Sequence, residues 1–126
     1  YIKTKEIEYR YSVKVANTLM LPAILKQINA LAKASKNLNK LDIKSDSFEK
    51  ELKTLINIYD EVKKLVAEME TFLALEHKDV HETAEKFASQ GVEILAKLRG
   101  QIDSAEDLVA DEFWPMASYQ KLLTAF

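Results

Sequence analysis

The stretch that decides the fold is FEKELKTLINIYDEVKKLVAEMETFL, residues 48 to 73. Its apolar side chains recur at alternating spacings of four and three, and Ile58, Leu65 and Phe72 widen the stripe on one flank. Such a stripe is typical of an amphipathic helix packed in a bundle. Asp46, followed three residues later by Glu49, resembles a capping box. The pattern predicts a helix over residues 47–75. The stripe consists of Phe48, Leu52, Leu55, Tyr59, Val62, Val66, Met69 and Leu73.

A further helix is predicted over residues 80–110. Asp79 and Glu82 repeat the capping pattern. Gly91 and Gly100 fall inside the stripe, and each costs about 1 kcal/mol relative to Ala in a helix interior. They either interrupt the helix or mark places where another helix approaches closely, and we expect one helix that bends near Gly100. The stripe is Phe87, Gly91, Ile94 or Leu95, Leu98, Ile102, Ala105 and Val109.

The first helix is predicted over residues 3–36, with a kink at Pro22. An interior proline kinks or breaks a helix, but the apolar stripe resumes in nearly the same phase beyond it, which favours one kinked helix over two. Residues 37–46 are expected to form a loop. The stripe consists of Ile7, Tyr11, Val15, Thr18 or Leu19, Leu21, Leu25, Ile28 and Ala32.

The chain as a whole is predicted to be all-α. It contains only two Gly and two Pro in 126 residues, which leaves few places to turn. The short link around His77 makes the second and third helices antiparallel neighbours. We therefore expect one domain over residues 1–126, an up-down-up bundle of three long helices with a short apolar C-terminal tail.

Composition excludes several classes of function. The 18 basic and 20 acidic residues are interspersed and no basic block stands out, so nucleic acid is not expected as a partner. The absence of Cys excludes disulfides and thiolate chemistry. The longest apolar run, Leu19 to Leu25, is much shorter than the about 20 residues that cross a bilayer, so no membrane partner is expected. We expect a cytoplasmic protein.

Catalytic, cofactor-binding and metal-binding residues are not predicted. His77 and His81 have a spacing that can bind a metal on one helix face, but the predicted helix begins between them, at Asp79. A solvated turn is therefore favoured over a metal site, which stays as the alternative. The glycines form no phosphate-binding loop, and no nucleophile motif is present.

The chain closes on DEFWPMASYQKLLTAF, residues 111 to 126. Its only Trp and a Pro follow the end of the helical periodicity, among large apolar residues. Such a tail either folds back to cap the bundle or docks on another domain or subunit, and the two are compatible. The packing and interface candidates are Trp114, Pro115, Tyr119, Leu21 and Pro22.

Three segments resemble the C-terminal helical domain of type III glutamine synthetases. They are YSVKVANTLMLPAILKQ at 11–27, ILAKLRGQIDSAEDLV at 94–109, and the closing segment with Trp114, Pro115 and Tyr119. The Trp-Pro pair followed by the Tyr is the most specific of these features. The resemblance covers nearly the whole chain, although the loop at 37–46 and much of the second helix contribute little to it.

The resemblance implies a parent enzyme that makes glutamine from glutamate, ammonia and ATP, through a γ-glutamyl phosphate and with a divalent metal such as magnesium. That chemistry would belong to a separate catalytic domain, so this fragment itself would be non-catalytic and hold no cofactor. The family forms large double-ring oligomers, so the expected partners are the catalytic domain of the same chain and neighbouring subunits.

Because the chain begins at Tyr1 rather than Met, we expect it to be the C-terminal fragment of a longer enzyme. Part of Leu19 to Leu25, or the tail, should then leave an apolar patch larger than the few hundred Å² typical of monomers. The alternative is a freestanding helical-bundle sensory or adaptor domain, and the third class is an independent helical enzyme.

Overall fold

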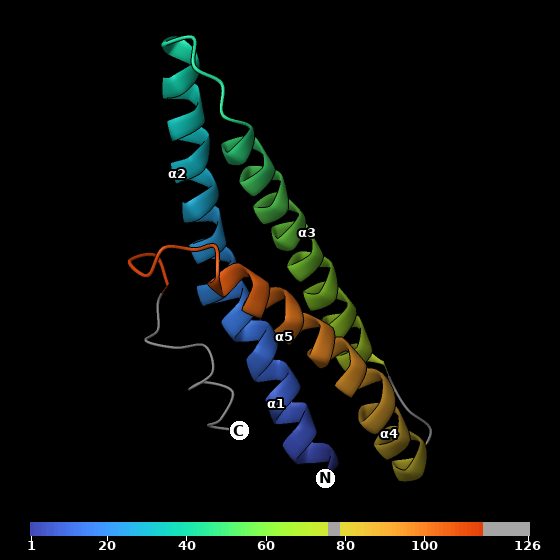
Figure 1. Ribbon diagram of the computed structural model, residues 1–126. Coiled ribbons are helices and arrows are strands. Elements are labelled where there is room, and N and C mark those ends of the chain that lie inside the picture. The colour runs from blue at the N-terminus through green and yellow to red at the C-terminus, as the bar shows by residue number, and fades with distance from the viewer. Residues whose placement is uncertain (76–78, 115–126) are drawn as a thin grey trace.

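The structure is a computed structural model that describes residues 1–75 and 79–114 (Figure 1). Its described residues form helices and turns, with no strand among them. A first rod runs without interruption through α1 (Ile2–Val15), η1 (Ala16–Met20) and α2 (Leu21–Lys40). The second rod is α3 (Asp46–Ala74), and the third consists of α4 (Val80–Lys86), η2 (Phe87–Gly91) and α5 (Val92–Glu106). The described part of the chain is therefore all-helical, with three rods packed as a bundle.

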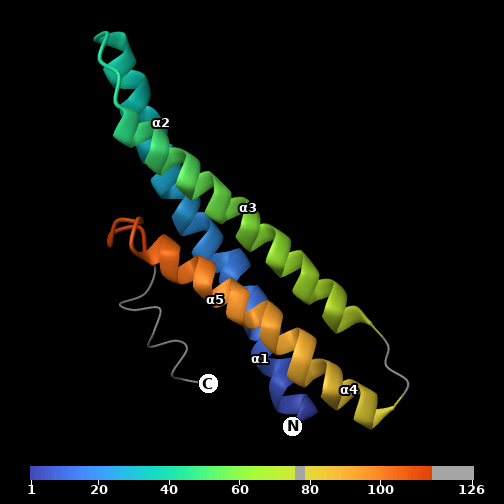
Figure 2. The same ribbon diagram turned by 45° about the vertical axis from the view of Figure 1, so that its right-hand side comes forward.

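The second rod lies at the centre of the packing. α3 contacts α1 and α2 of the first rod and α5 of the third. Figures 1 and 2 both show that α2 and the beginning of α3 extend beyond the end of α5. The bundle thus has three rods along one part of its length and only two, α2 and α3, along the other.

Two π-helical turns, η1 and η2, interrupt the α-helical geometry of the first and third rods. Backbone dihedrals stay helical at Leu21, whose N–H donates to the carbonyl of Ala16. A proline ring clashes with the carbonyl four residues before it, and Thr18, the residue concerned here, lies inside the widened turn. The predicted bend near Gly100 is wrong in position, since the irregular turn ends at Gly91 and Gly100 lies within α5.

The apolar stripe predicted for the first rod is wrong in phase. Ile7 is 62% exposed, and Tyr11 and Leu25 are exposed as well, whereas Tyr9 and Ile24 are fully buried. The buried residues Tyr9, Ala16, Met20, Ile24 and Leu31 follow one helical period along the whole rod, through η1. The predicted stripe follows the opposite side at Ile7, Tyr11 and Leu25, although Val15 and Leu21 within it are buried.

The predicted loop at 37–46 is wrong at its start, because α2 continues to Lys40. Asp42 adopts φ 59°, in the left-handed region. Its N–H donates to the carbonyl of Asn39, and the N–H of Ile43 donates to that of Leu38. This pair of bonds is a Schellman motif, which Gly usually closes. Asp in the glycine position explains why the sequence pattern placed the helix end too early.

The remaining boundaries differ from prediction by small amounts. The N-cap of α3 is Ser45, whose side chain accepts from the N–H of Phe48, so Asp46 is the first helical residue and not the cap. The predicted cap at Asp79 is confirmed by a 2.7 Å bond from the N–H of Glu82 to its Oδ1. The third rod ends at Glu106 rather than 110, and turns follow it.

The interior divides into two groups of side chains. An aliphatic core extends along α2, α3 and α5 and includes Leu21, Ile24, Leu55, Val62 and Trp114. An aromatic cluster of Tyr9, Met69, Phe72, Phe87 and Leu95 joins α1, α3, η2 and α5. The stripes predicted for the second and third rods supply most of the buried residues on those rods, which confirms both stripes.

Candidate functional site

The two ends of the described chain meet in the aliphatic core. Leu21 is 4% exposed and Trp114 is 9% exposed, and both belong to this core although they are distant in sequence. Ala105 and Val109 reach the same core from the end of α5 and from the turn after it. The segment that resembles the family's Leu-Pro-Ala element and the one that carries its Trp are therefore packed into one interior.

The turn after α5 is fixed by hydrogen bonds. Gln27 of α2 accepts the backbone N–H of Ala110 through its Oε1, at 3.0 Å. The N–H of Phe113 donates to the carbonyl of Ala110, and that of Trp114 donates to the carbonyl of Asp111. Because the chain enters Trp114 through a closed turn that is anchored on α2, the indole is held in a defined place. The Trp114 Nε1 is buried and has no hydrogen-bond partner among the described residues.

The five packing candidates fall into different environments. Leu21 and Trp114 are buried, whereas Pro22 is exposed on the outside of the first rod. Pro115 and Tyr119 lie outside the described residues. The expected exposed patch at 19–25 is reduced to part of that segment, since Met20, Ala23 and Ile24 are buried and Leu25 is 45% exposed. The tail, the other segment named for that patch, lies outside the described residues after Trp114.

The aromatic cluster contains the most specific contact between the first and third rods. The hydroxyl of Tyr9 donates a 2.6 Å hydrogen bond to the carbonyl of Phe87, in the first residue of η2. The Tyr9 and Phe87 ring centroids are 5.6 Å apart, and those of Tyr9 and Phe72 are 6.2 Å apart in an edge-to-face arrangement. Burial raises the pKa of Tyr9 to about 12, so the donated proton is held firmly.

Gly91 gives the Tyr9 ring its space. A Cβ added at this position would lie 2.4 Å from Cε2 of Tyr9 and 2.8 Å from its hydroxyl oxygen. Gly100 has no atom within 4 Å of the equivalent position. Of the two roles proposed for the glycines, a close approach of another helix is therefore found at Gly91. Gly100 lies beside open space.

An ion pair also joins the first and third rods, between Glu8, the residue before Tyr9, and Arg99, four residues after Leu95. Arg99 Nη2 is 3.1 Å from Glu8 Oε1, and Lys5 Nζ is 3.4 Å from Glu8 Oε2. The Arg99 side chain is 36% exposed, so the pair contributes little stability on its own. The ion pair instead favours one alignment of α1 along α5, the one that places Glu8 opposite Arg99.

The described residues offer little that could support catalysis. They contain no group of three or more His, Asp or Glu side chains placed to hold a metal ion. His81 is exposed, and His77 lies outside the described residues. A groove of about 570 Å³ runs between α3 and the third rod, lined by Lys64, Ala67, Glu68, Thr71, Phe72, Leu75, Gln90 and Ile94.

Sequence reasoning missed several of the residues that tie the rods together. Tyr9 lies off the stripe predicted for the first rod, and Gln27 and Glu8 are not among the predicted packing residues. Gly91 carried a usable signal, since a glycine within an apolar stripe often marks close packing. Gln27 and Glu8 carried none, because their partners depend on how the rods are placed in three dimensions.

Comparisons with known proteins identified no matching family model, curated protein or solved structure. Within the described parts of the chain, the helices fall short of the length and apolar character needed to span a membrane.

Proposed function

We propose that this chain is a non-catalytic assembly domain, an up-down-up three-helix bundle kinked at Pro22, at the C-terminus of a type III glutamine synthetase. Its role is to pack against the catalytic domain of the same chain and against neighbouring subunits of a cytoplasmic homo-oligomer. The parent enzyme ligates ammonia to glutamate with ATP and a divalent metal, and its catalytic residues lie in the other domain.

One observation carries the proposal: Leu21 and Trp114 share one buried core. The most specific part of the resemblance is Trp114-Pro115 with Tyr119, and the segment with Leu21, Pro22 and Ala23 adds to it from the other half of the sequence. Segments that belong to one structural unit are expected to pack in one interior, as Leu21 and Trp114 do.

The character of the interior also fits an assembly role. The buried residues in the described part of the chain are apolar, and buried polar or charged residues are absent from it. Catalytic sites usually need polar groups with perturbed pKa values that converge on a cavity. Here the one group with a clearly raised pKa, Tyr9, donates to a backbone carbonyl inside the aromatic cluster.

The reading frame that encodes the chain tests the proposal first. We expect a catalytic domain with metal- and nucleotide-binding strands to precede Tyr1. The full-length protein should make glutamine from glutamate, ammonia and ATP, and removing the 126 residues should disrupt its assembly. A frame that encodes membrane spans or a signalling output domain would support the alternative, a sensory or adaptor domain.

A matched pair of leucines separates folding from assembly in the full-length protein. Leu21 is buried and Leu25, one helical turn later, is 45% exposed. Leu21→Ala should lower the stability of the domain by about 2–5 kcal/mol, as for a buried Leu. Leu25→Ala should leave stability nearly unchanged. If Leu25→Ala alters the mass of the assembly, the exposed side of the first rod is part of a contact.

A further inference from the structure

We infer that the outer side of α2 binds a second copy of this chain, through the acidic turn that follows α5 in that copy. This inference deepens the proposed assembly function, which it takes as its basis, by naming one surface and its partner. Two charged surfaces of opposite sign carry it, both exposed and both on the same chain.

The first surface is a stripe of lysines on α2. Within Leu21–Lys40, the charged residues are four lysines, and no acidic residue occurs. Lys26, Lys33, Lys36 and Lys40 follow spacings of seven, three and four. These spacings place them on one side of a helix, opposite the buried residues Ile24 and Leu31. All four lysines are exposed, and no ion pair to them occurs among the described residues.

The second surface is the acidic turn at the end of the third rod. Residues 103–112 contain five acidic side chains and no Lys or Arg: Asp103, Glu106, Asp107, Asp111 and Glu112. All but the half-buried Glu106 are exposed. In the described part of the chain none of the five is in an ion pair. Composition alone hides both surfaces, because their charges nearly cancel within the net charge of −2.

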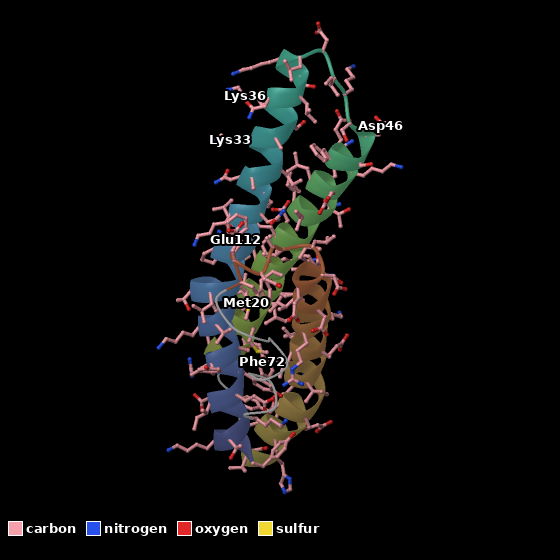
Figure 3. The ribbon with its side chains drawn as sticks, turned by 60° about the vertical axis from the view of Figure 1, so that its left-hand side comes forward. Met20, Lys33, Lys36, Asp46, Phe72 and Glu112 are labelled. Atoms are coloured by element: carbon pink, nitrogen blue, oxygen red, sulfur yellow. The ribbon has the colours of Figure 1, made fainter. Side chains whose placement is uncertain are left out.

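Within one chain the two surfaces form no ion pair among the described residues. Gln27 holds the turn by accepting from the N–H of Ala110. Gln27 and Lys33 are six positions apart, which at 3.6 residues per turn is a rotation of about 120° around α2. In Figure 3, Lys33 and Lys36 project from the outer side of α2, and Glu112, on the turn after α5, lies further down on the same side of the view. The chain's own acidic turn is therefore held at Gln27, away from Lys33 and Lys36.

A second copy can bring the two surfaces together. The lysine stripe from residue 26 to residue 40 is about 21 Å long, at 1.5 Å per residue. The four lysines along this length can form ion pairs with the acidic side chains of a neighbour's turn. When a single stripe-to-turn contact joins two copies, the contact is head-to-tail, and the resulting dimer leaves one lysine stripe and one acidic turn free. Association should therefore continue beyond a dimer and weaken with salt.

Sedimentation velocity of the 126-residue chain tests the inference, at low salt and at about 0.5 M salt, where the Debye length falls to about 4 Å and exposed ion pairs are weakened. We expect the average mass to rise with concentration at low salt and to fall back at high salt. A stripe variant, Lys33→Gln with Lys36→Gln, and a turn variant, Asp107→Asn with Asp111→Asn, should each self-associate about tenfold or more weakly. All four residues are exposed, so both variants should fold.

Mixing the two variants gives the decisive result. The stripe variant keeps its acidic turn and the turn variant keeps its lysines, so together they should form a one-to-one complex that grows no further. A wild-type chain that stays monomeric at low salt, or a mixture that forms no complex, overturns the inference. So does a monomer that instead binds duplex DNA or vesicles of anionic lipid. The proposed function fails separately, if the reading frame contains no catalytic domain.

Discussion

The aromatic cluster and the aliphatic core hold the same three rods together in different ways. The core is built from side chains of similar kind, such as Leu55, Val62 and Leu98, repeated along the helices. The cluster depends on particular partners: a Tyr9 hydroxyl, a Phe87 carbonyl and a glycine at position 91 with no side chain. The first region stabilises through buried area, and the second fixes which residues of the first and third rods face each other.

This difference predicts how the two regions respond to mutation. Apolar cores tolerate substitutions that conserve volume, at a cost usually below about 1.5 kcal/mol. A contact that combines a buried hydrogen bond with a close approach does not tolerate such substitutions, because a change of side chain leaves either an unpaired polar group or a steric clash. The cluster should therefore respond to small chemical changes, and the core mainly to the loss of volume.

The largest expected effect is on the aliphatic core. Trp114→Ala should lower the free energy of unfolding by about 3–5 kcal/mol, because it leaves a large cavity. Chemical denaturation followed by circular dichroism measures this, with Leu25→Ala as the exposed control. A loss below about 1 kcal/mol would mean that the indole is not part of the core. Light scattering on the same samples shows whether the oligomeric state changes as well.

The next effect belongs to the aromatic cluster and depends on pH. An unfolded chain releases a tyrosine proton near pH 10, whereas folding raises the pKa of Tyr9 to about 12. Between these values the unfolded state binds fewer protons, so stability should fall as pH rises, by at most about 1.4 kcal/mol per pH unit. The contribution is complete below pH 10 and is lost through about pH 12.

Tyr9→Phe is the control for this pH dependence. It should be less stable at neutral pH by about 1–2 kcal/mol, because the Phe87 carbonyl loses its donor. Its stability should then fall less steeply between pH 10 and 12 than that of the wild type, since the other alkaline groups titrate in both proteins. Denaturation curves that stay parallel over this range would show that Tyr9 ionises equally easily in both states.

A smaller effect of opposite sign is expected at the two glycines. Gly100→Ala should stabilise the chain by about 1 kcal/mol through helix propensity. Gly91→Ala has the same propensity gain but forces the added Cβ against the buried Tyr9 ring, and overpacking costs about 1–3 kcal/mol. Thermal and chemical denaturation of both variants should rank Gly91→Ala as the less stable of the two. Equal stabilisation would contradict the close approach.

The smallest effect lies outside both regions, at the end of α2. Asp42→Gly should stabilise the chain by roughly 0.5 kcal/mol, because the left-handed conformation is strained for residues with a Cβ. The greater flexibility of Gly in the unfolded chain offsets part of that gain. Asp42→Ala is the matched control and should be destabilising. A stabilising Asp42→Ala would indicate that residue 42 is not left-handed.

The sequence predicted the second and third rods well, because their apolar residues recur at regular helical spacing and most of them lie on a single helical face. The stripe of α3, including Ile58, Leu65 and Phe72 on its flank, is wide because α3 packs against α2 on one side and α5 on the other. The stripe through Leu95, Leu98, Ile102 and Ala105 is buried as expected.

The first rod shows why the rest was not predictable. In α1 the apolar residues Ile7, Tyr9, Tyr11, Val13 and Val15 occur at every second position, so more than one helical face looks apolar. The presence and place of the π-helical turn η1 do not follow from helix propensity either. Tyr9 is selected by partners on the second and third rods, which no local pattern contains.

The packing candidates divide in the same way. The sequence identified Trp114 and Leu21 because large apolar residues next to a Pro stand out from the surrounding charged helices. The lysines of α2 do not stand out as a surface in the sequence, because charges of both signs are interspersed along the chain and the lysines gather only on one side of the folded helix. Only the arrangement of the rods shows which of those charges lack partners.

The most direct test of the structure is a double-mutant cycle between Tyr9→Ala and Gly91→Ala, measured as free energies of unfolding. The central claim is that the first and third rods meet at these two residues, which are far apart in sequence. If they do, Gly91→Ala should be markedly less favourable in the wild type than in the Tyr9→Ala background. In the Tyr9→Ala background, Gly91→Ala should stabilise the chain by about 1 kcal/mol, as Gly100→Ala is expected to do in the wild type. An effect of Gly91→Ala that is the same in both backgrounds would contradict the claim.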